Sequence, residues 1–232
     1  FALLISACGK EINNSRSEGS EGIKKTGELE LKYAKQFKAD YYEGGYIHVS
    51  MLDGTDYIVV PEGGEEKDLG IKDAVYIHKN PRNVYLAASF AADLVLQLGE
   101  IDNIKFCSTK ASDFFIGEIS ELIDGGSIQY VGKFSAPDYE LLLDEGCDLA
   151  IESTTVYHAP EVLEQLKNLG IPVFIERSSY ESSPEGRLEW IKLYGALFGR
   201  EAEASDYFDK QCRGIEEVKS SVKDREPKEV ML

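Results

Sequence analysis

Histidine and cysteine are the side chains in this sequence that could bind a metal ion or act as a nucleophile. The histidines, His48, His78 and His158, lie far apart, and no two cysteines have the Cys-x-x-Cys spacing of a zinc site. The His-Glu-x-x-His, Gly-x-Ser-x-Gly, Gly-x-Gly-x-x-Gly and phosphate-loop patterns of hydrolases and nucleotide-binding proteins are also missing. We therefore predict no catalytic residue, no metal site and no cofactor, and hence a protein that is not an enzyme.

One cysteine suggests a different chemistry. The apolar run that begins the chain ends in Ser6, Ala7 and Cys8, and polar residues follow it. This order resembles the lipobox of a bacterial lipoprotein, in which cleavage before the cysteine leaves a thiol that carries lipid. We expect 1–7 to be a partial signal peptide and Cys8 to be the lipidation site. The alternative is a piece of a buried strand or helix, but the solvated segment that follows favours the lipobox.

The composition excludes two further classes of protein. The chain of 232 residues has a net charge of -17 and a pI near 4.6. Nucleic-acid backbones are bound by clustered Lys and Arg, so we predict no nucleic-acid partner. No stretch approaches the roughly 20 apolar residues of a membrane-spanning helix. We therefore expect the protein to contact the membrane through the lipid on Cys8.

The remaining cysteines, Cys107, Cys147 and Cys212, are odd in number and have no close pairing. We interpret Cys107 and Cys147 as small buried hydrophobic residues at strand edges. A disulfide among the three stays open, so the sequence leaves their redox state undetermined.

Two segments precede the main part of the chain. Residues 8–30 are polar and non-periodic, which indicates a flexible tether after the lipidated cysteine. Within 31–76, aromatic and β-branched runs at 37–42, 46–51 and 57–60 are separated by Gly-rich turns. Such runs between turns predict a small antiparallel β-meander.

From residue 77 to 200, apolar runs alternate with helical patterns. The predicted strands are 84–88, 103–107, 127–131, 148–151 and 171–175, and the predicted helices are 91–98, 114–123, 137–144, 160–169 and 185–198. This alternation predicts an α/β, Rossmann-like lobe with a mainly parallel sheet.

The end of the chain predicts a long helix. An apolar stripe over 201–223 would form a helix of roughly 35 Å, long enough to join two lobes. We assign 201–224 to this inter-lobe helix and 225–232 to the first strand of a second lobe that is missing. Together with the partial signal peptide, this predicts a piece of a longer protein, truncated at both ends.

In an open parallel sheet, ligands bind beyond the carboxyl ends of the strands. The loops at that edge contain serines, lysines, a histidine and several aromatic residues, which suit recognition of a small molecule. The alternatives are helix capping for the serines, loop packing for the aromatic residues, and pairing with nearby acidic residues for the arginine. The candidate ligand-binding residues are Ser89, Lys110, Lys133, Phe134, Tyr157, His158, Tyr180 and Arg187.

Five stretches, in their order and spacing, carry a family resemblance. They are Pro81-Arg-Asn-Val-Tyr-Leu86, residues 130–140, Cys147-Asp-Leu-Ala-Ile-Glu152, residues 163–173 and residues 185–199. Together they resemble the substrate-binding lipoproteins of ABC importers, of the iron-siderophore, haem and vitamin B12 class. The sequence Gly146-Cys147-Asp148-Leu149 departs from the Lys-Pro-Asp-Leu of relatives, which weakens that one motif.

This resemblance implies a class III fold, in which one long helix joins two lobes and the ligand lies in the cleft between them. It implies that Glu140 docks on the permease and that Phe134 supplies an aromatic wall of the cleft. It also implies a ferric chelate, haem or a corrinoid as the ligand.

We therefore expect an extracytoplasmic, lipid-anchored, monomeric protein that captures a metal chelate and delivers it to an ABC importer permease. A hydrolase-like surface lipoprotein and an adhesive or structural one stay open as alternatives, because a second lobe could supply further residues. The sequence does not identify the ligand, nor does it give the contribution of the missing lobe.

Overall fold

The computed structural model describes residues 23–222. The expected signal peptide over 1–7, Cys8, the first part of the tether and the expected start of a second lobe over 225–232 lie outside these residues. Within the described range, no helix combines the length and the apolar character that a membrane crossing requires.

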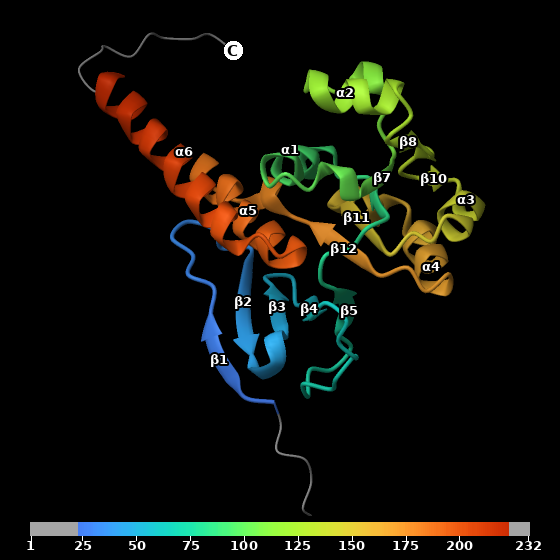
Figure 1. The fold of residues 1–232 in the computed structure, drawn as a ribbon, viewed down its shortest axis with the longest axis horizontal. Coiled ribbons are helices and arrows are strands. Elements are labelled where there is room, and N and C mark those ends of the chain that lie inside the picture. The colour runs from blue at the N-terminus through green and yellow to red at the C-terminus, as the bar shows by residue number, and fades with distance from the viewer. Residues whose placement is uncertain (1–22, 223–232) are drawn as a thin grey trace, which may run out of the picture.

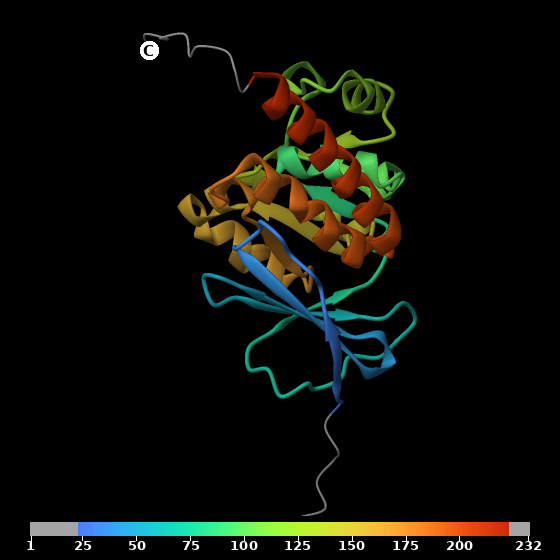
Figure 2. The same cartoon turned by 90° about the vertical axis from the view of Figure 1, so that its left-hand side faces the viewer.

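The first sheet has the strand order β1-β2-β3-β4-β5 and lies beside the main lobe (Figures 1 and 2). We call this sheet and its loops, residues 23–78, the extension. Strands β1 to β4 are antiparallel, as the meander prediction requires, but β5 is parallel to β4. The strands are β1 (Lys25–Glu28), β2 (Phe37–Tyr42), β3 (Ile47–Met51), β4 (Asp56–Val60) and β5 (Val75–His78).

The extension corrects the sequence prediction in two places. The tether predicted over 8–30 does not reach residue 30, because Lys25–Glu28 form β1. This segment has no apolar alternation; it pairs with β2 through its backbone, with an ion pair of 2.8 Å between Lys25 and Asp40. Strand β5 crosses the boundary predicted after residue 76. The long loop over 61–74 allows β5 to return parallel to β4, since parallel strands need a long connection.

The second sheet is the parallel sheet predicted from the alternating pattern. Its strand order is β12-β11-β6-β7-β8, and every pairing is parallel. Helices α1 and α5 pack on one face of the sheet, and α3 and α4 on the other (Figure 1). The elements are β6 (Val84–Leu86), α1 (Ser89–Gln97), β7 (Ile104–Cys107), α2 (Gly117–Asp124), β8 (Gln129–Tyr130), the β9–β10 hairpin (Gly132–Lys133 and Ala136–Pro137), α3 (Tyr139–Asp144), β11 (Leu149–Ser153), α4 (Pro160–Asn168), β12 (Val173–Glu176) and α5 (Pro184–Phe198).

The predicted long helix is α6, Glu201–Val222, which crosses α5 and continues beyond the lobe (Figure 1). Gly199, with φ of 71°, ends α5 in the left-handed conformation that glycine adopts without strain. The crossing is close at Gly195, where an added Cβ would lie 2.6 Å from the Cβ of Ala204. Glycine at 195 is therefore required for this approach of the two helices.

The extension and the lobe share one hydrophobic core. Phe37 of β2 packs edge-to-face on Trp190 of α5, with ring centroids 5.0 Å apart. Tyr57 of β4 packs on Phe174 of β12 at the same separation, and its hydroxyl accepts a hydrogen bond of 3.0 Å from the Ile175 amide. Because β12 is the edge of its sheet, this contact also satisfies an amide that no neighbouring strand pairs.

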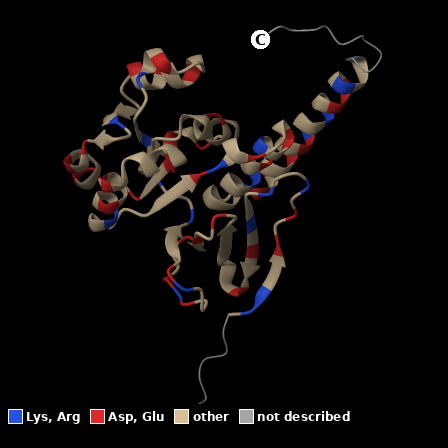
Figure 3. Ribbon diagram, turned by 180° about the vertical axis from the view of Figure 1, so that it is seen from behind, with Lys and Arg blue, Asp and Glu red and all other residues tan. Residues whose placement is uncertain are grey.

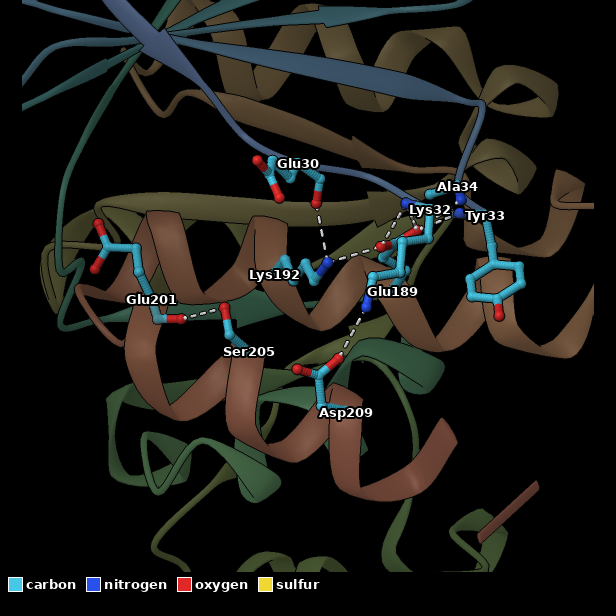
Figure 4. Close-up of polar contacts among 9 residues, drawn as sticks. All are labelled: Glu30, Lys32, Tyr33, Ala34, Glu189, Lys192, Glu201, Ser205 and Asp209. Atoms are coloured by element: carbon cyan, nitrogen blue, oxygen red, sulfur yellow. Dashed lines mark hydrogen bonds and ion pairs between the residues drawn. The ribbon is translucent and has the colours of Figure 1, made fainter. Parts of the chain in front are cut away.

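A buried carboxylate fixes the chain where it enters β2. Glu189 of α5 accepts hydrogen bonds of 2.7–3.0 Å from the backbone amides of Lys32, Tyr33 and Ala34 (Figure 4). The Lys192 ammonium lies 2.8 Å from the same carboxylate. Burial alone would raise the pKa of Glu189, but the bonds from Lys192 and these amides outweigh burial and leave the pKa below its ordinary value.

A second carboxylate continues this arrangement. Glu181, which is buried, accepts bonds of 2.9–3.0 Å from the amides of Lys35 and Gln36 and one of 3.0 Å from the Trp190 indole. Two glutamates of the lobe thus bind the five consecutive amides of 32–36. We call Glu181 and Glu189 the carboxylate anchor.

The carboxylate anchor gives a stability prediction. Glu189→Ala leaves Lys192 and the amides of 32–34 without their buried acceptor, so it should lower the free energy of unfolding by about 3–5 kcal/mol. Because the pKa of Glu189 is lowered, this contribution is present above the ordinary glutamate pKa and is lost as the pH falls through the folded-state value.

Urea unfolding followed by circular dichroism, at neutral pH and at pH 3–4, measures the effect. The control is Glu203→Ala, which removes a carboxylate on α6 that is 55% exposed and should change the free energy by less than about 0.5 kcal/mol. A loss below about 1 kcal/mol for Glu189→Ala at neutral pH would mean that water replaces the carboxylate.

Candidate functional site

All five strands of the second sheet run in the same direction, so their carboxyl ends form one edge. We call this the carboxyl edge. The segments that follow its strands are 87–89, 108–110, 131–134, a 3-10 turn at Thr154–His158 and a second one at Ser178–Tyr180. Seven of the eight candidate ligand-binding residues lie in or next to these segments. Arg187 lies in the first turn of α5, shortly after the last segment.

Lysines occupy the β7–β8 end of the carboxyl edge. Lys110 is exposed and lies over the Tyr130 ring, 5.9 Å from its centroid, and Lys133 is exposed on β9. Neither lysine forms an ion pair with another residue of 23–222. Acidic residues are spread over most elements of the protein (Figure 3), so these two lysines place positive charge locally at the strand ends.

Four other candidate residues make few contacts or none that indicate a role. Arg187 donates a bond of 3.4 Å to the Ser179 carbonyl and forms no ion pair within the described residues, so the predicted alternative of pairing with nearby acids is wrong. Ser89 is the exposed first residue of α1, whose N-cap is Ala88, so it does not cap the helix. His158 is exposed, and Phe134 is half-buried in the turn between β9 and β10.

The β11–β12 end of the carboxyl edge is aromatic. Tyr157 and Tyr180 are 46% and 55% exposed. They are linked through two residues that the sequence analysis missed, Arg177 at the end of β12 and Asp53 from the turn between β3 and β4. Asp53 accepts bonds from Arg177 and Tyr157, and the Arg177 guanidinium lies over the Tyr180 ring. The structure thus brings these two tyrosines together at one end of the edge.

A buried glutamate lies at the end of β11, the strand between β12 and β6. Glu152 has no solvent exposure, and neither of its carboxyl oxygens has a hydrogen-bond partner among the described residues. Tyr85 on β6 pairs in register with Ala150, which places Tyr85 and Glu152 on the same face of the sheet. Burial raises the pKa of Glu152 to about 8, so this group is mostly neutral at pH 7.

A second buried glutamate, Glu176, ends β12. Its carboxylate accepts a bond of 2.7 Å from the Ser178 amide, which orders the turn that carries Tyr180. Burial raises the pKa of Glu176 above its ordinary value, and the bonds to Ser178 only partly oppose this. Like Glu152, Glu176 is buried beneath the carboxyl edge, so a ligand cannot contact it.

Glu140, the residue expected to dock on a permease, is exposed in the first turn of α3. The helix begins after Asp138, whose side chain accepts the Leu141 amide at 3.1 Å and so caps the N-terminus. The cap fixes the start of α3 and therefore the position of Glu140. This helix lies on the face of the sheet opposite α1 and α5.

The three cysteines within 23–222 form no disulfide. Cys107 and Cys147 are buried and free, as predicted for small hydrophobic residues, and Cys212 is half-buried and free. Burial raises the pKa of Cys107 to about 11 and that of Cys147 to about 12, so neither is a reactive thiolate at neutral pH. Residues 23–222 also contain no group of three side chains suited to binding a metal ion.

These features define a class of fold: an α/β lobe with ligand-accessible loops at its carboxyl edge and a long helix that leaves the lobe. Solved substrate-binding proteins of ABC importers share it, as the resemblance predicted. The petrobactin-binding protein YclQ of Bacillus subtilis matches with a TM-score of 0.53 and 18% identity, over 77% of this chain and 54% of that protein. The iron-uptake substrate-binding protein PiuA of Streptococcus pneumoniae matches with a TM-score of 0.52 and 21% identity, over 65% and 50%.

The relatives found by sequence comparison are lipoproteins. An uncharacterized lipoprotein of Methanocaldococcus jannaschii is 25% identical over 224 residues, which are 92% of this chain and 55% of the relative. A second lipoprotein of that organism is 28% identical over 101 residues, 44% of this chain and 24% of the relative. This chain therefore spans at most about half the length of these relatives. No model of a known protein family matches it.

Glu152 provides a pH-dependent prediction. The unfolded chain loses this proton near pH 4.5, whereas the folded protein holds it to about pH 8. Between these values the folded state binds more protons, so the contribution of Glu152 to stability falls as the pH rises. Glu152→Gln cannot ionise and should raise the melting temperature by roughly 2–8 °C at pH 8, and by much less at pH 4.5.

Differential scanning calorimetry at the two pH values measures this difference. Glu140→Gln, an exposed carboxylate, is the matched control and should show no such dependence. Equal shifts for Glu152→Gln at both pH values would contradict a buried proton at this site.

Proposed function

We propose that this protein is the ligand-binding lobe of an extracytoplasmic solute-binding lipoprotein, which captures an anionic metal chelate and delivers it to an ABC importer permease. The carboxyl edge is the ligand surface, and α6 is the strut toward a second lobe. The ligand is a ferric siderophore; haem and a corrinoid are the alternative metal chelates. The protein performs no chemistry on its ligand.

One observation carries the proposal. On a chain with a net charge of -17, exposed and unpaired Lys110 and Lys133 follow adjacent strands at the place where open parallel sheets bind ligands. A local cationic site on an acidic protein suits an anionic guest, which it attracts against the overall field.

Three further points support the delivery role. The relatives in Methanocaldococcus jannaschii are named lipoproteins, and the expected lipidation site, Cys8, would hold the protein on the membrane through the segment before β1. The solved proteins of the same fold include an iron-uptake substrate-binding protein. Exposed Glu140 supplies an acidic group for a basic pocket of a permease.

Ligand binding tests the proposal directly. Titration of the whole protein with ferric citrate, a ferric tris-catecholate, haemin and cyanocobalamin, followed by quenching of intrinsic fluorescence, should give a dissociation constant for at least one of them. Lys110→Glu combined with Lys133→Glu should weaken an anionic chelate tenfold or more, or about 1.4 kcal/mol. The control is Lys72→Glu, a lysine 91% exposed on the extension, which should have no effect. Binding of none of the four would contradict the proposal.

The permease contact gives a separate prediction. Glu140→Ala should leave ligand affinity unchanged and reduce uptake of the iron chelate in cells several-fold, because only the docking surface is altered. Asp144→Ala, at the other end of the same helix, is the matched control and should support normal uptake. If Glu140→Ala reduces affinity instead, the residue belongs to the ligand site and the docking role is wrong.

A further inference from the structure

The turn between β3 and β4 reaches from the extension to the carboxyl edge of the other sheet. Asp53, in this turn, accepts a bond of 2.8 Å from Arg177 and one of 3.4 Å from Tyr157. Its other carboxyl oxygen accepts the Thr55 amide at 3.0 Å, which fixes the turn itself. One side chain of the extension therefore connects the segments that follow two neighbouring strands of the lobe, β11 and β12.

This connection neutralises and immobilises Arg177. The side chain is 13% exposed, and its guanidinium lies 4.8 Å from the centroid of the Tyr180 ring. The carboxylate of Asp53 accepts a bond from Nη1 and the ring covers one face, while Nε is buried and has no hydrogen-bond partner among the described residues. Since the side chain is only 13% exposed, little of the group reaches a ligand in solution. Burial would raise the pKa of Asp53, but the bonds from Thr55 and the charge of Arg177 outweigh it and keep the carboxyl group ionised.

Exposed side chains with apolar surface lie next to the Asp53–Arg177 pair in space or in sequence. Leu52, the neighbour of Asp53, is 69% exposed, and Tyr157 and Tyr180 are about half exposed. The carboxyl edge therefore has two unlike ends: a cationic end at Lys110 and Lys133, and an uncharged aromatic end that the extension completes.

We propose that the β3–β4 turn is a wall of the ligand site, and that Asp53 positions Arg177 and Tyr157 so that the aromatic end binds an aromatic ring through its apolar face. This inference rests on the proposed function and narrows it. The ligand is an anionic chelate that carries aromatic rings. Its charged part faces the two lysines, and a ring lies among Leu52, Tyr157 and Tyr180. Asp53 acts as a positioning residue.

The sign of the effect separates this proposal from a simpler one. If Arg177 were the anion-binding group, Asp53 would compete with the ligand, and its removal would tighten binding. If Asp53 positions an aromatic surface, its removal lets Arg177 and Tyr157 move, and binding weakens. The two hypotheses predict opposite changes in ligand affinity when Asp53 is replaced.

The test compares two ferric probes on the whole protein, a tris-catecholate that carries rings and citrate that carries none. The wild type should bind the catecholate more tightly. Asp53→Ala should weaken the catecholate five- to tenfold and citrate less than twofold. Asp53→Asn keeps an acceptor oxygen and should restore at least half of the lost affinity on a logarithmic scale. Arg177→Ala should match Asp53→Ala, and the double variant should be no worse than either.

A second experiment tests whether the β3–β4 turn lies next to the bound ligand, without changing Asp53. An environment-sensitive dye on Leu52→Cys, in a Cys8→Ser and Cys212→Ser background, should change its emission when the catecholate binds. The matched control is a dye on Glu43→Cys, in the exposed turn at the opposite end of the same strands, which should not respond. The melting temperature of each variant checks that the fold is kept.

Three results would overturn the inference while leaving the proposed function intact. These are tighter or unchanged catecholate binding by Asp53→Ala, equal responses of the two dyes, and preference of the wild type for citrate. Binding of no probe, including haemin and cyanocobalamin, would instead remove the proposed function and this inference with it.

Discussion

The carboxylate anchor is the interaction on which the arrangement of this protein depends. Two buried glutamates, Glu181 and Glu189, satisfy five consecutive backbone amides of 32–36, a segment that belongs to no strand or helix. Buried amides without partners are costly, so an irregular segment can lie against a core only where side chains accept its hydrogen bonds. The anchor thereby lets β2 start at a fixed place against α5, and the register of the β2–β3–β4 hairpins follows from that start.

The same anchor connects the extension to the long helix. Lys192 of α5 bonds to Glu189 and to the Glu30 carbonyl, and its ammonium lies 4.4 Å from the centroid of the Phe208 ring on α6. Lys32 forms an ion pair of 3.3 Å with Asp209 on the same helix. Extension, α5 and α6 thus meet at one cluster of charges, which is buried at Glu189 and Lys192 and exposed at Lys32 and Asp209. A displacement of the extension would therefore also displace the first part of α6. In this respect the extension and the lobe form one structural unit.

The fold was predictable where a local pattern determines it. The alternation after residue 77 predicted the parallel sheet, and the helix predicted over 185–198 agrees with α5 within one residue. The prediction failed where tertiary contacts decide. The helix predicted to begin at Phe114 begins at Gly117, because Phe114 and Ile116 have an extended backbone and Phe115 lies fully in solvent. At the site, the sequence indicated Tyr157 and Tyr180, but Asp53 looked like an ordinary turn residue. Nothing local shows that its turn lies against strands more than a hundred residues away.

The electrostatics of the carboxyl edge follow from where its acidic groups are placed. Asp53, Glu152 and Glu176 all lie at or against the ends of β11 and β12, and three negative charges there would cancel the attraction of the lysines. Burial raises the pKa of Glu152 to about 8, and it also raises the pKa of Glu176, which favours their neutral forms. Asp53 stays charged but is paired with Arg177 at 2.8 Å. Burial and pairing thus limit the negative charge at the β11–β12 end, and exposed Lys110 and Lys133 add positive charge at the other end, although the chain as a whole is strongly acidic.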